Sequence, residues 1–310
     1  MESKIELTQI YRYDNLVSDL NQLAKQFPNL VELEMIGTSV EGRKLLALKV
    51  GTGDVKVICH GAHHAREWMT SRLIVDFICH LITSEAEPWK HIREEWLDRM
   101  TFWFVPMVNP DGVTLVQDGP DQFSNRDELI DLNDDSLDFS SWKANARGVD
   151  LNRQYPIDWG EIQADPGRPS SSNYKGEHPL SEPEIKSLVD FVNQHDFDCA
   201  LAYHSSGEEI FWRYNLPNRF IESFRPLANQ LADVTKYCLI EPEGIPSGGG
   251  FTDWFLTKFK KPSFTFEIAP YIGPRPVPDH YYDQVFYDNK LVLYTVGDYL
   301  LDNSAERLKK

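Results

Sequence analysis

The sequence predicts an α/β fold, with a mixed, mostly parallel twisted sheet flanked by helices. Short apolar runs typical of strands alternate with longer runs whose apolar residues recur at helical spacing. With 310 residues and 41% hydrophobic content, the chain is long enough to bury a large core. We find no internal repeat and no linker rich in glycine, serine or proline, so we expect one domain over residues 1–310.

The N-terminal part predicts one helix followed by two strands. Apolar residues recur at helical spacing: Leu16, Leu20, Leu23 and Phe27. Pro28 ends this helix. Residues 30–51 then predict two strands joined by a turn around Glu41 and Gly42.

The middle of the chain predicts a strand, a helix and a second strand. VKVICHGAH, residues 55–63, is the first strand, and residues 67–83 form an apolar helix directly after it. MTFWFVPMV, residues 100–108, is the second strand, and the turn signal NPDG ends it. The acidic residues 118–141 predict a solvated loop that could also rim a site. Calcium binding is the weaker alternative, because no spaced calcium-loop motif appears.

The C-terminal part predicts two helices and two strands. Residues 181–194 begin with a capping box, in which Ser181 precedes Glu184 by three positions. Two short apolar runs predict strands, and a final helix is expected near the C-terminus. Their ranges are 198–206 and 262–269 for the strands and 288–302 for the helix.

Charge and hydropathy limit the partners. The formal net charge of −17 argues against nucleic acid or an anionic membrane as a partner. No stretch approaches the roughly 18 apolar residues of a membrane span, and the N-terminus has no apolar signal region. We therefore expect a cytoplasmic protein, or a secreted one if a targeting segment was removed. The sequence leaves the oligomeric state open.

The four cysteines show no metal-ligand spacing. They are Cys59, Cys79, Cys199 and Cys238. We expect buried, reduced thiols at these positions.

Polar residues follow several of the predicted strands. In α/β sheets, ligands bind beyond the carboxyl ends of the strands. A single histidine after a strand is more often a hydrogen-bonded structural residue, but several ionisable groups at such ends suggest one cluster. These residues are His64, Glu67, Asn109, Asp111, His204 and Glu267.

Zinc explains this cluster. A catalytic zinc site uses three protein ligands and leaves one position open, and His64, Glu67 and His204 supply two nitrogens and one carboxylate. His63 is a competing ligand, but the HxxE spacing favours His64, because His63 lies before the helix begins. Glu267 is then the general base for a water molecule. We expect one Zn²⁺ ion, although this ligand set also admits other divalent ions.

These residues resemble the zinc carboxypeptidases of the carboxypeptidase A type. The resemblance runs from about Tyr11 to Leu300, and the family's motifs appear in the family's order. They are HAREW at 64–68, NPDG at 109–112, GVDLNR at 148–153, YHSSG at 203–207, GGGFTDW at 248–254 and FTFE at 264–267. An ordered set of this kind is specific, whereas one such motif alone is weak.

The resemblance implies roles for further residues. Asn152 and Arg153 would hold a substrate carboxylate, and Asp150 would orient His64 by a hydrogen bond. Lys143 stands where the family usually has the arginine that stabilises the oxyanion, so a point charge replaces a fork of donors. Arg66 would face the substrate.

Several cations come from motifs that we expect to meet at the site. They are Arg66, Lys143, Arg147 and Arg153. In a chain of net charge −17, they would focus positive potential on a carboxylate-bearing substrate. Arg147 lies outside the family's motif, and local pairing with an acid is an equal alternative for it.

Two departures separate the chain from the digestive members of the family. Ile245 stands where those enzymes cap the substrate with a tyrosine, and Thr252 occupies the floor of the specificity pocket. HHAREW, WKANARGVDLNR, GGGFTDW and PRPVP resemble instead a bacterial branch of γ-D-glutamyl–meso-diaminopimelate peptidases, which cut murein stem peptides. That resemblance implies a murein-peptide substrate.

Other functions remain as alternatives. A carboxypeptidase acting on ordinary L-peptides is the main one, because Asn152 and Arg153 would also bind a plain C-terminal carboxylate. An acyl-amino-acid hydrolase of the aspartoacylase type shares the HxxE motif but lacks the match over nearly the full length. A non-catalytic peptide-binding protein is disfavoured, because all three ligands and the base are present.

Overall fold

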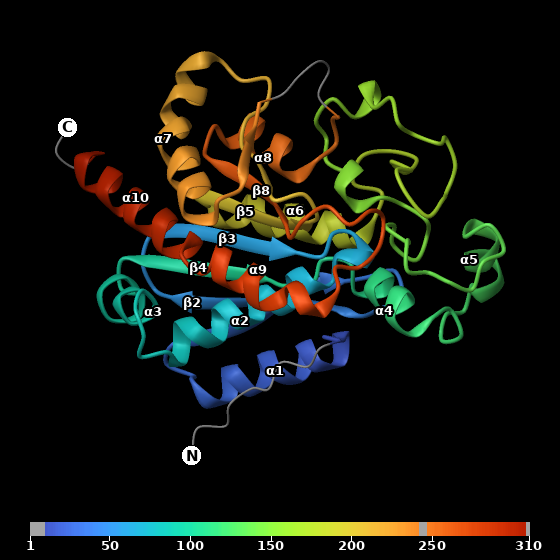
Figure 1. Cartoon of the computed structure of the whole chain (residues 1–310), viewed down its shortest axis with the longest axis horizontal. Coiled ribbons are helices and arrows are strands. Elements are labelled where there is room, and N and C mark those ends of the chain that lie inside the picture. The colour runs from blue at the N-terminus through green and yellow to red at the C-terminus, as the bar shows by residue number, and fades with distance from the viewer. Residues whose placement is uncertain (1–9, 242–246, 308–310) are drawn as a thin grey trace.

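The computed structural model describes residues 10–241 and 247–307, and its centre is an eight-stranded sheet (Figure 1). The strand order is β1-β2-β4-β3-β5-β8-β6-β7. The strands are β1 Val31–Thr38, β2 Lys44–Gly51, β3 Val55–Gly61, β4 Met100–Val105, β5 Cys199–Ser205, β6 Glu209–Phe211, β7 Cys238–Ile240 and β8 Ser263–Ile268.

Helices surround this sheet (Figure 1). They are α1 Tyr13–Gln26, α2 Met69–Thr83, α3 Trp89–His91, α4 Pro110–Asp118, α5 Arg126–Leu132, α6 Pro183–His195, α7 Asn218–Thr235, α8 Phe251–Phe259, α9 Tyr282–Asn289 and α10 Val292–Arg307. None of the described helices is long and apolar enough to cross a lipid bilayer.

The central strands run parallel, and the sheet is mixed at its borders. β3 pairs in parallel with both β4 and β5, and β5 pairs in parallel with β8. The pairs β1–β2, β2–β4 and β6–β8 are antiparallel. The predicted mixed α/β sheet is therefore confirmed, and the carboxyl ends of β3, β5 and β8 meet at one edge.

Two apolar layers cover the two faces of the sheet. Alternate residues of a strand face opposite sides, so Cys59 and Leu201 pack with α2, α7, α9 and α10. Ile58 and Ala200 face the other side and pack with α6 and α8. Strands buried on both faces explain why their sequences are continuous apolar runs rather than alternating ones.

The structure corrects three predicted elements around loops and helix starts. NPDG is not a simple turn: Asn109 caps α4 by accepting a hydrogen bond from the Gly112 amide at 2.9 Å. The predicted loop 118–141 contains α5. The single helix predicted at 288–302 is divided, because α9 ends at Asn289 and α10 begins at Val292.

The predicted capping box of α6 is wrong. The helix begins at Pro183 with Glu182 as its cap residue. The Ser181 hydroxyl donates instead to Gln154 and to Glu182, and the Glu184 carboxylate accepts from the Val40 amide at 3.1 Å. Tertiary partners therefore outcompete the local motif.

The cysteines are free, as predicted, but not all are buried. Cys59 and Cys199 are buried, whereas Cys79 is partly exposed and Cys238 is exposed. Cys238 begins the short edge strand β7, where only one neighbouring strand covers it. The prediction of a buried thiol is therefore wrong for Cys238.

Candidate active site

The HAREW motif leaves β3 in a tight backbone path that is held on both sides. Ala62 has φ 51°, and its amide donates to the Thr70 hydroxyl at 2.8 Å. The amides of Ala65 and Arg66 donate to the carbonyls of Lys143 and Trp142 at 3.0 and 3.1 Å. These bonds fix the 3₁₀ turn Ala65–Glu67 against the segment that carries Lys143.

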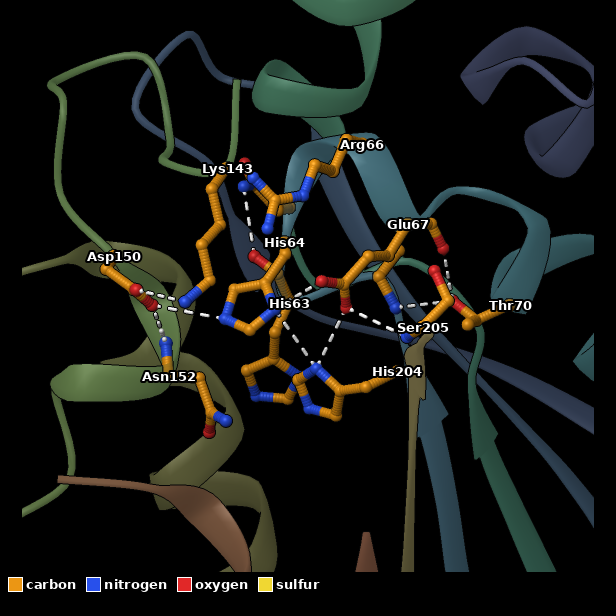
Figure 2. Close-up of polar contacts among 12 residues, drawn as sticks. His63, His64, Arg66, Glu67, Thr70, Lys143, Asp150, Asn152, His204 and Ser205 are labelled. Atoms are coloured by element: carbon orange, nitrogen blue, oxygen red, sulfur yellow. Dashed lines mark hydrogen bonds and ion pairs between the residues drawn. The ribbon is translucent and has the colours of Figure 1, made fainter. Parts of the chain in front are cut away.

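Three side chains converge at the ends of β3 and β5, and we call them the metal-ligand cluster: His64, Glu67 and His204 (Figure 2). His64 Nδ1 lies 2.9 Å from Glu67 Oε1, and His204 Nδ1 lies 3.0 Å from Glu67 Oε2. The two Nδ1 atoms lie 3.1 Å apart. One atom of each residue falls within 4.8 Å of the others, and all three residues are buried.

This donor set fits zinc. Two imidazole nitrogens and one carboxylate are the ligands of a catalytic zinc site, and their donor atoms face one point. Burial alone raises the pKa of Glu67, but His64 and His204 hold it below its usual value, so the carboxylate is ionised as a ligand requires. Burial lowers the pKa of His204, which keeps that imidazole neutral.

His63 is not one of the three grouped ligands. Its ring stacks on that of His204 with centroids 5.5 Å apart, and its Nε2 lies 2.8 Å from the Tyr155 hydroxyl. The geometry thus favours His64 over its neighbour, as the HxxE spacing predicts.

Asp150 lies beside the cluster and contacts both His64 and Lys143 (Figure 2). Its Oδ1 lies 3.2 Å from His64 Nε2, and its Oδ2 forms an ion pair with Lys143 Nζ at 2.8 Å. Burial raises the pKa of Asp150, yet Lys143 and His64 hold it well below its usual value. This contact is on Nε2, the ring nitrogen opposite the Nδ1 that lies near the other ligands, so the predicted role of Asp150 in orienting His64 fits the geometry and stays a prediction.

Glu267 stands next to the cluster because of strand register. It pairs with His204 across β5 and β8, and its side chain makes no hydrogen bond with any residue that the structure describes. Burial raises the pKa of Glu267 to about 8, with the charge of Glu67 adding to the rise and Lys143 opposing it. A carboxyl group whose pKa is raised toward neutrality is suited to take and return a proton.

A cavity of about 200 Å³ opens beside the cluster. Six of the residues predicted for the site line it: His64, Lys143, Asn152, Arg153, Thr252 and Glu267. Asn152 is held by the Phe251 amide, which donates to Oδ1 at 3.0 Å, and Arg153 Nη1 donates to the Asn152 carbonyl at 2.8 Å. The floor is polar, since the hydroxyls of Thr252 and Thr265 lie 2.7 Å apart.

Two predicted cations do not line this cavity. Arg66 is not among its lining residues, and its Nη1 donates to the Ser141 carbonyl at 2.9 Å. Arg147 is largely exposed and lies 3.8 Å from Glu182, so the local-pairing alternative holds for it. The substrate role of Arg66 stays a prediction. Lys143 lines the cavity and is therefore better placed than Arg147 to stabilise an oxyanion. Ile245 lies outside the described residues.

Six lining residues were not singled out as site residues in the sequence: Phe211, Ser247, Gly250, Phe251, Asp253 and Thr265. Phe211 pairs with Thr265 across β6 and β8, so both face the cavity with Glu267. Their signal was the strand period of two around Glu267. Asp253 directly follows Thr252 within GGGFTDW, and an acid next to a predicted pocket residue was the signal for it in the sequence. We use the name pocket wall for Arg153 and Asp253 together with the two floor residues, Thr252 and Thr265.

Comparisons with known proteins agree with this geometry. A sequence profile described as zinc carboxypeptidase matches residues 16–271. Gamma-D-glutamyl-L-diamino acid endopeptidase 1 from Lysinibacillus sphaericus is 32% identical over 298 residues, covering 94% of this chain and 73% of that protein. Carboxypeptidase B from Rattus norvegicus is 27% identical, covering 84% of this chain and 63% of that protein.

Solved structures share the fold. Carboxypeptidase A from Helicoverpa armigera has a TM-score of 0.74 at 22% identity, covering 96% of this chain and 76% of that chain. Murein-tripeptide amidase MpaA from Escherichia coli O157 has a TM-score of 0.52 at 22% identity, covering 84% and 91%. The profile match covers most of the chain and contains the whole metal-ligand cluster and Glu267. This protein therefore belongs to the zinc carboxypeptidase family and is a zinc metallopeptidase.

Proposed function

We propose that this peptidase hydrolyses the amide bond between a γ-D-glutamyl residue and a diamino acid, as found in murein peptides. The observation that carries the proposal is the 32% identity, over 94% of the chain, to a protein named for γ-D-glutamyl-L-diamino acid cleavage. The polar, charged cavity beside the metal-ligand cluster supports a leaving residue that carries its own charges.

The proposed reaction divides between the zinc ion and the chain. A zinc ion held by His64, Glu67 and His204 supplies a Lewis acid that polarises a carbonyl and lowers the pKa of water. Asp150 keeps His64 aligned for this task through its contact with Nε2.

The remaining residues bind the substrate and move one proton. Glu267 takes the proton of the attacking water and passes it to the leaving nitrogen, while the C–N bond breaks. Lys143 lies at the cavity beside His64, where its charge stabilises the oxyanion of the tetrahedral intermediate. Asn152 and Arg153 hold a carboxylate of the leaving residue and so set which bond reaches Glu267.

The second candidate function is hydrolysis of ordinary L-peptides at a free C-terminus. The likeness to rat carboxypeptidase B supports it, and Asn152 and Arg153 suit any terminal carboxylate. The acyl-amino-acid hydrolase alternative gains no support from the relatives described above. A purely binding role is disfavoured by the intact ligand set and base.

The test is turnover of two substrates by the zinc-loaded protein. One is L-Ala-γ-D-Glu-meso-diaminopimelate, and the other is an L-peptide of equal length with a free C-terminus. Release of diaminopimelate with the L-peptide intact is the expected result. Cleavage of the L-peptide alone would overturn the proposal in favour of the second candidate. The Glu267→Gln variant, purified in the same way, controls for contaminating peptidases.

A further inference from the structure

Asp253 is a carboxylate in the cavity that the mechanism above does not use. It lies in the first turn of α8, next to the floor residue Thr252, and it lines the cavity together with Arg153. Its side chain makes no hydrogen bond and no ion pair with any residue that the structure describes. Burial raises the pKa of Asp253 to about 7, Arg153 opposes the rise and Asp158 adds to it.

The neighbouring charges leave Asp253 available. Asp158 already accepts a hydrogen bond from the Tyr214 hydroxyl at 2.6 Å, and it does not line the cavity. Arg153 donates to the Asn152 carbonyl, and no ion pair joins it to Asp253. Arg153 and Asp253 therefore carry opposite charges in the cavity without an ion pair between them.

Two unpaired opposite charges in one cavity are complementary to a ligand that carries both signs. A ligand with only a carboxylate pairs with Arg153 but brings its charge near Asp253, which must then take a proton or remain unpaired in a poorly solvated place. A ligand with a carboxylate and an ammonium group satisfies both residues. An ammonium group at Asp253 also gains a charge-assisted hydrogen bond.

A structural role for Asp253 is the simplest rival. An acid in the first turn of a helix interacts favourably with the positive end of the helix dipole. That role explains an acid at this position, but it does not require the carboxylate to line the cavity that holds Arg153 and Glu267. The two roles make different predictions for ligand selectivity.

We propose that Asp253 recognises the second amino group of the leaving residue, so that the pocket wall selects diamino acids. This inference rests on the proposed function, in which the leaving residue occupies this cavity. Arg153 takes a carboxylate of that residue, Asp253 accepts from its ammonium group, and the hydroxyls of Thr252 and Thr265 form the polar floor between the strands and α8.

The experiment compares two N-acetylated amino acids that differ by one free amino group. N-acetyl-meso-diaminopimelate and N-acetyl-2-aminopimelate, each acylated on the amino group that forms the scissile bond, are titrated into the zinc-loaded protein, and their dissociation constants are measured by calorimetry. We expect the diamino acid to bind at least about tenfold more tightly, because a site built for a polar group rejects the analogue that lacks it. Equal affinities in the unmodified protein would overturn the proposal.

Asp253→Asn should abolish this preference by weakening the diamino acid alone. Asp158→Asn is the matched control, because it removes a nearby carboxylate that does not line the cavity, and the preference should persist. If Asp253→Asn weakens both ligands equally, or lowers the melting temperature while the preference persists, Asp253 has only a structural role. Asp253→Ser provides a second variant if Asp253→Asn does not fold.

Binding and turnover separate this inference from the proposed function. Selective binding of N-acetyl-meso-diaminopimelate without hydrolysis of the γ-D-glutamyl tripeptide would keep Asp253 as the selective residue and reject the proposed linkage. Hydrolysis of that tripeptide without selective binding would keep the proposed function and reject the role of Asp253.

Discussion

The metal-ligand cluster and the pocket wall are built in different ways. The cluster comes from the ends of β3 and β5 and the turn that follows β3, and each of its side chains contacts another member. The pocket wall comes from the first turn of α8, the 3₁₀ turn Leu151–Arg153 and Thr265 of β8. The side chain of Asp253 has no hydrogen-bond partner among the described residues. The side chains of the cluster thus contact one another, whereas the carboxylate of Asp253 remains available to a substrate.

This difference separates reaction from specificity. Changes in the cluster should affect every substrate alike, because the reaction depends on it. Changes in the pocket wall should depend on the leaving residue. The predictions below test this division, beginning with the largest expected effect.

His204→Ala should lose both zinc and activity. Two ligands remain, and the loss of the Lewis acid should lower kcat/KM by more than about 10³-fold for every substrate. Zinc content by mass spectrometry, measured together with turnover, checks this prediction. Full zinc occupancy in the variant would remove His204 from the site.

Glu267→Gln should keep zinc and lose turnover. The amide keeps the shape of the carboxyl but cannot accept the water's proton, so kcat should fall by about 10²–10⁴-fold. Zinc content and the affinity for a free leaving amino acid should change little. An active variant would show that another group is the base.

Asp150→Asn should have an intermediate effect through His64. Loss of the charge behind a metal-binding histidine typically lowers metal affinity or activity by about 10–100-fold. Competition with a chelator measures zinc affinity. The same change also removes the ion pair of Lys143, so Lys143→Met serves as a comparison. Unchanged zinc affinity in Asp150→Asn would contradict the orienting role of Asp150.

Thr252→Val should have a small effect that depends on the substrate. The side chain keeps its size but loses the hydroxyl that meets Thr265, at a cost of about 1 kcal/mol for ligands with polar leaving groups. Ratios of kcat/KM for polar and apolar leaving residues check this. An equal loss for both would break the division between cluster and wall.

Glu184→Gln tests a buried acid far from the reaction. Burial raises the pKa of Glu184 to about 8 from 4.5, so the folded state holds a proton that the unfolded state releases between those values. Stability from this group is therefore greatest at low pH and falls as pH rises from about 4.5 to 8. The variant should raise stability by on the order of a few kcal/mol at pH 8 and change it little at pH 4.5, as thermal unfolding at both values would show. Turnover should not change.

Local pattern predicted the elements that carry the cluster. The strands with VKVIC, CALAY and SFTFE form where they were expected, and the helix predicted from Glu67 begins at Met69, because short apolar runs and a longer apolar run favour buried strands and a buried helix respectively. Parallel strands bring their carboxyl ends to one edge, so His64, Glu67, His204 and Glu267 were expected together before their distances were known.

The sequence pattern predicted helix boundaries less well, because residues distant in the chain can take the hydrogen bonds that a local capping motif would make. Ser181 reads as a helix cap, but Gln154 and Glu182 take its hydroxyl. NPDG reads as a turn, yet the residues after it bury enough apolar surface to form α4. Helix boundaries depend on such partners, which no local window contains.

By itself, the sequence determined the α/β architecture and predicted the ligand set and the general base, because each prediction depends on residue type at a strand end. Only the tertiary structure decided that Lys143 pairs with Asp150, that Arg147 turns to Glu182, and that Asp253 shares a cavity with Arg153. Pairing between charges depends on distances of a few ångströms between segments far apart in the chain, and residue type alone does not set those distances.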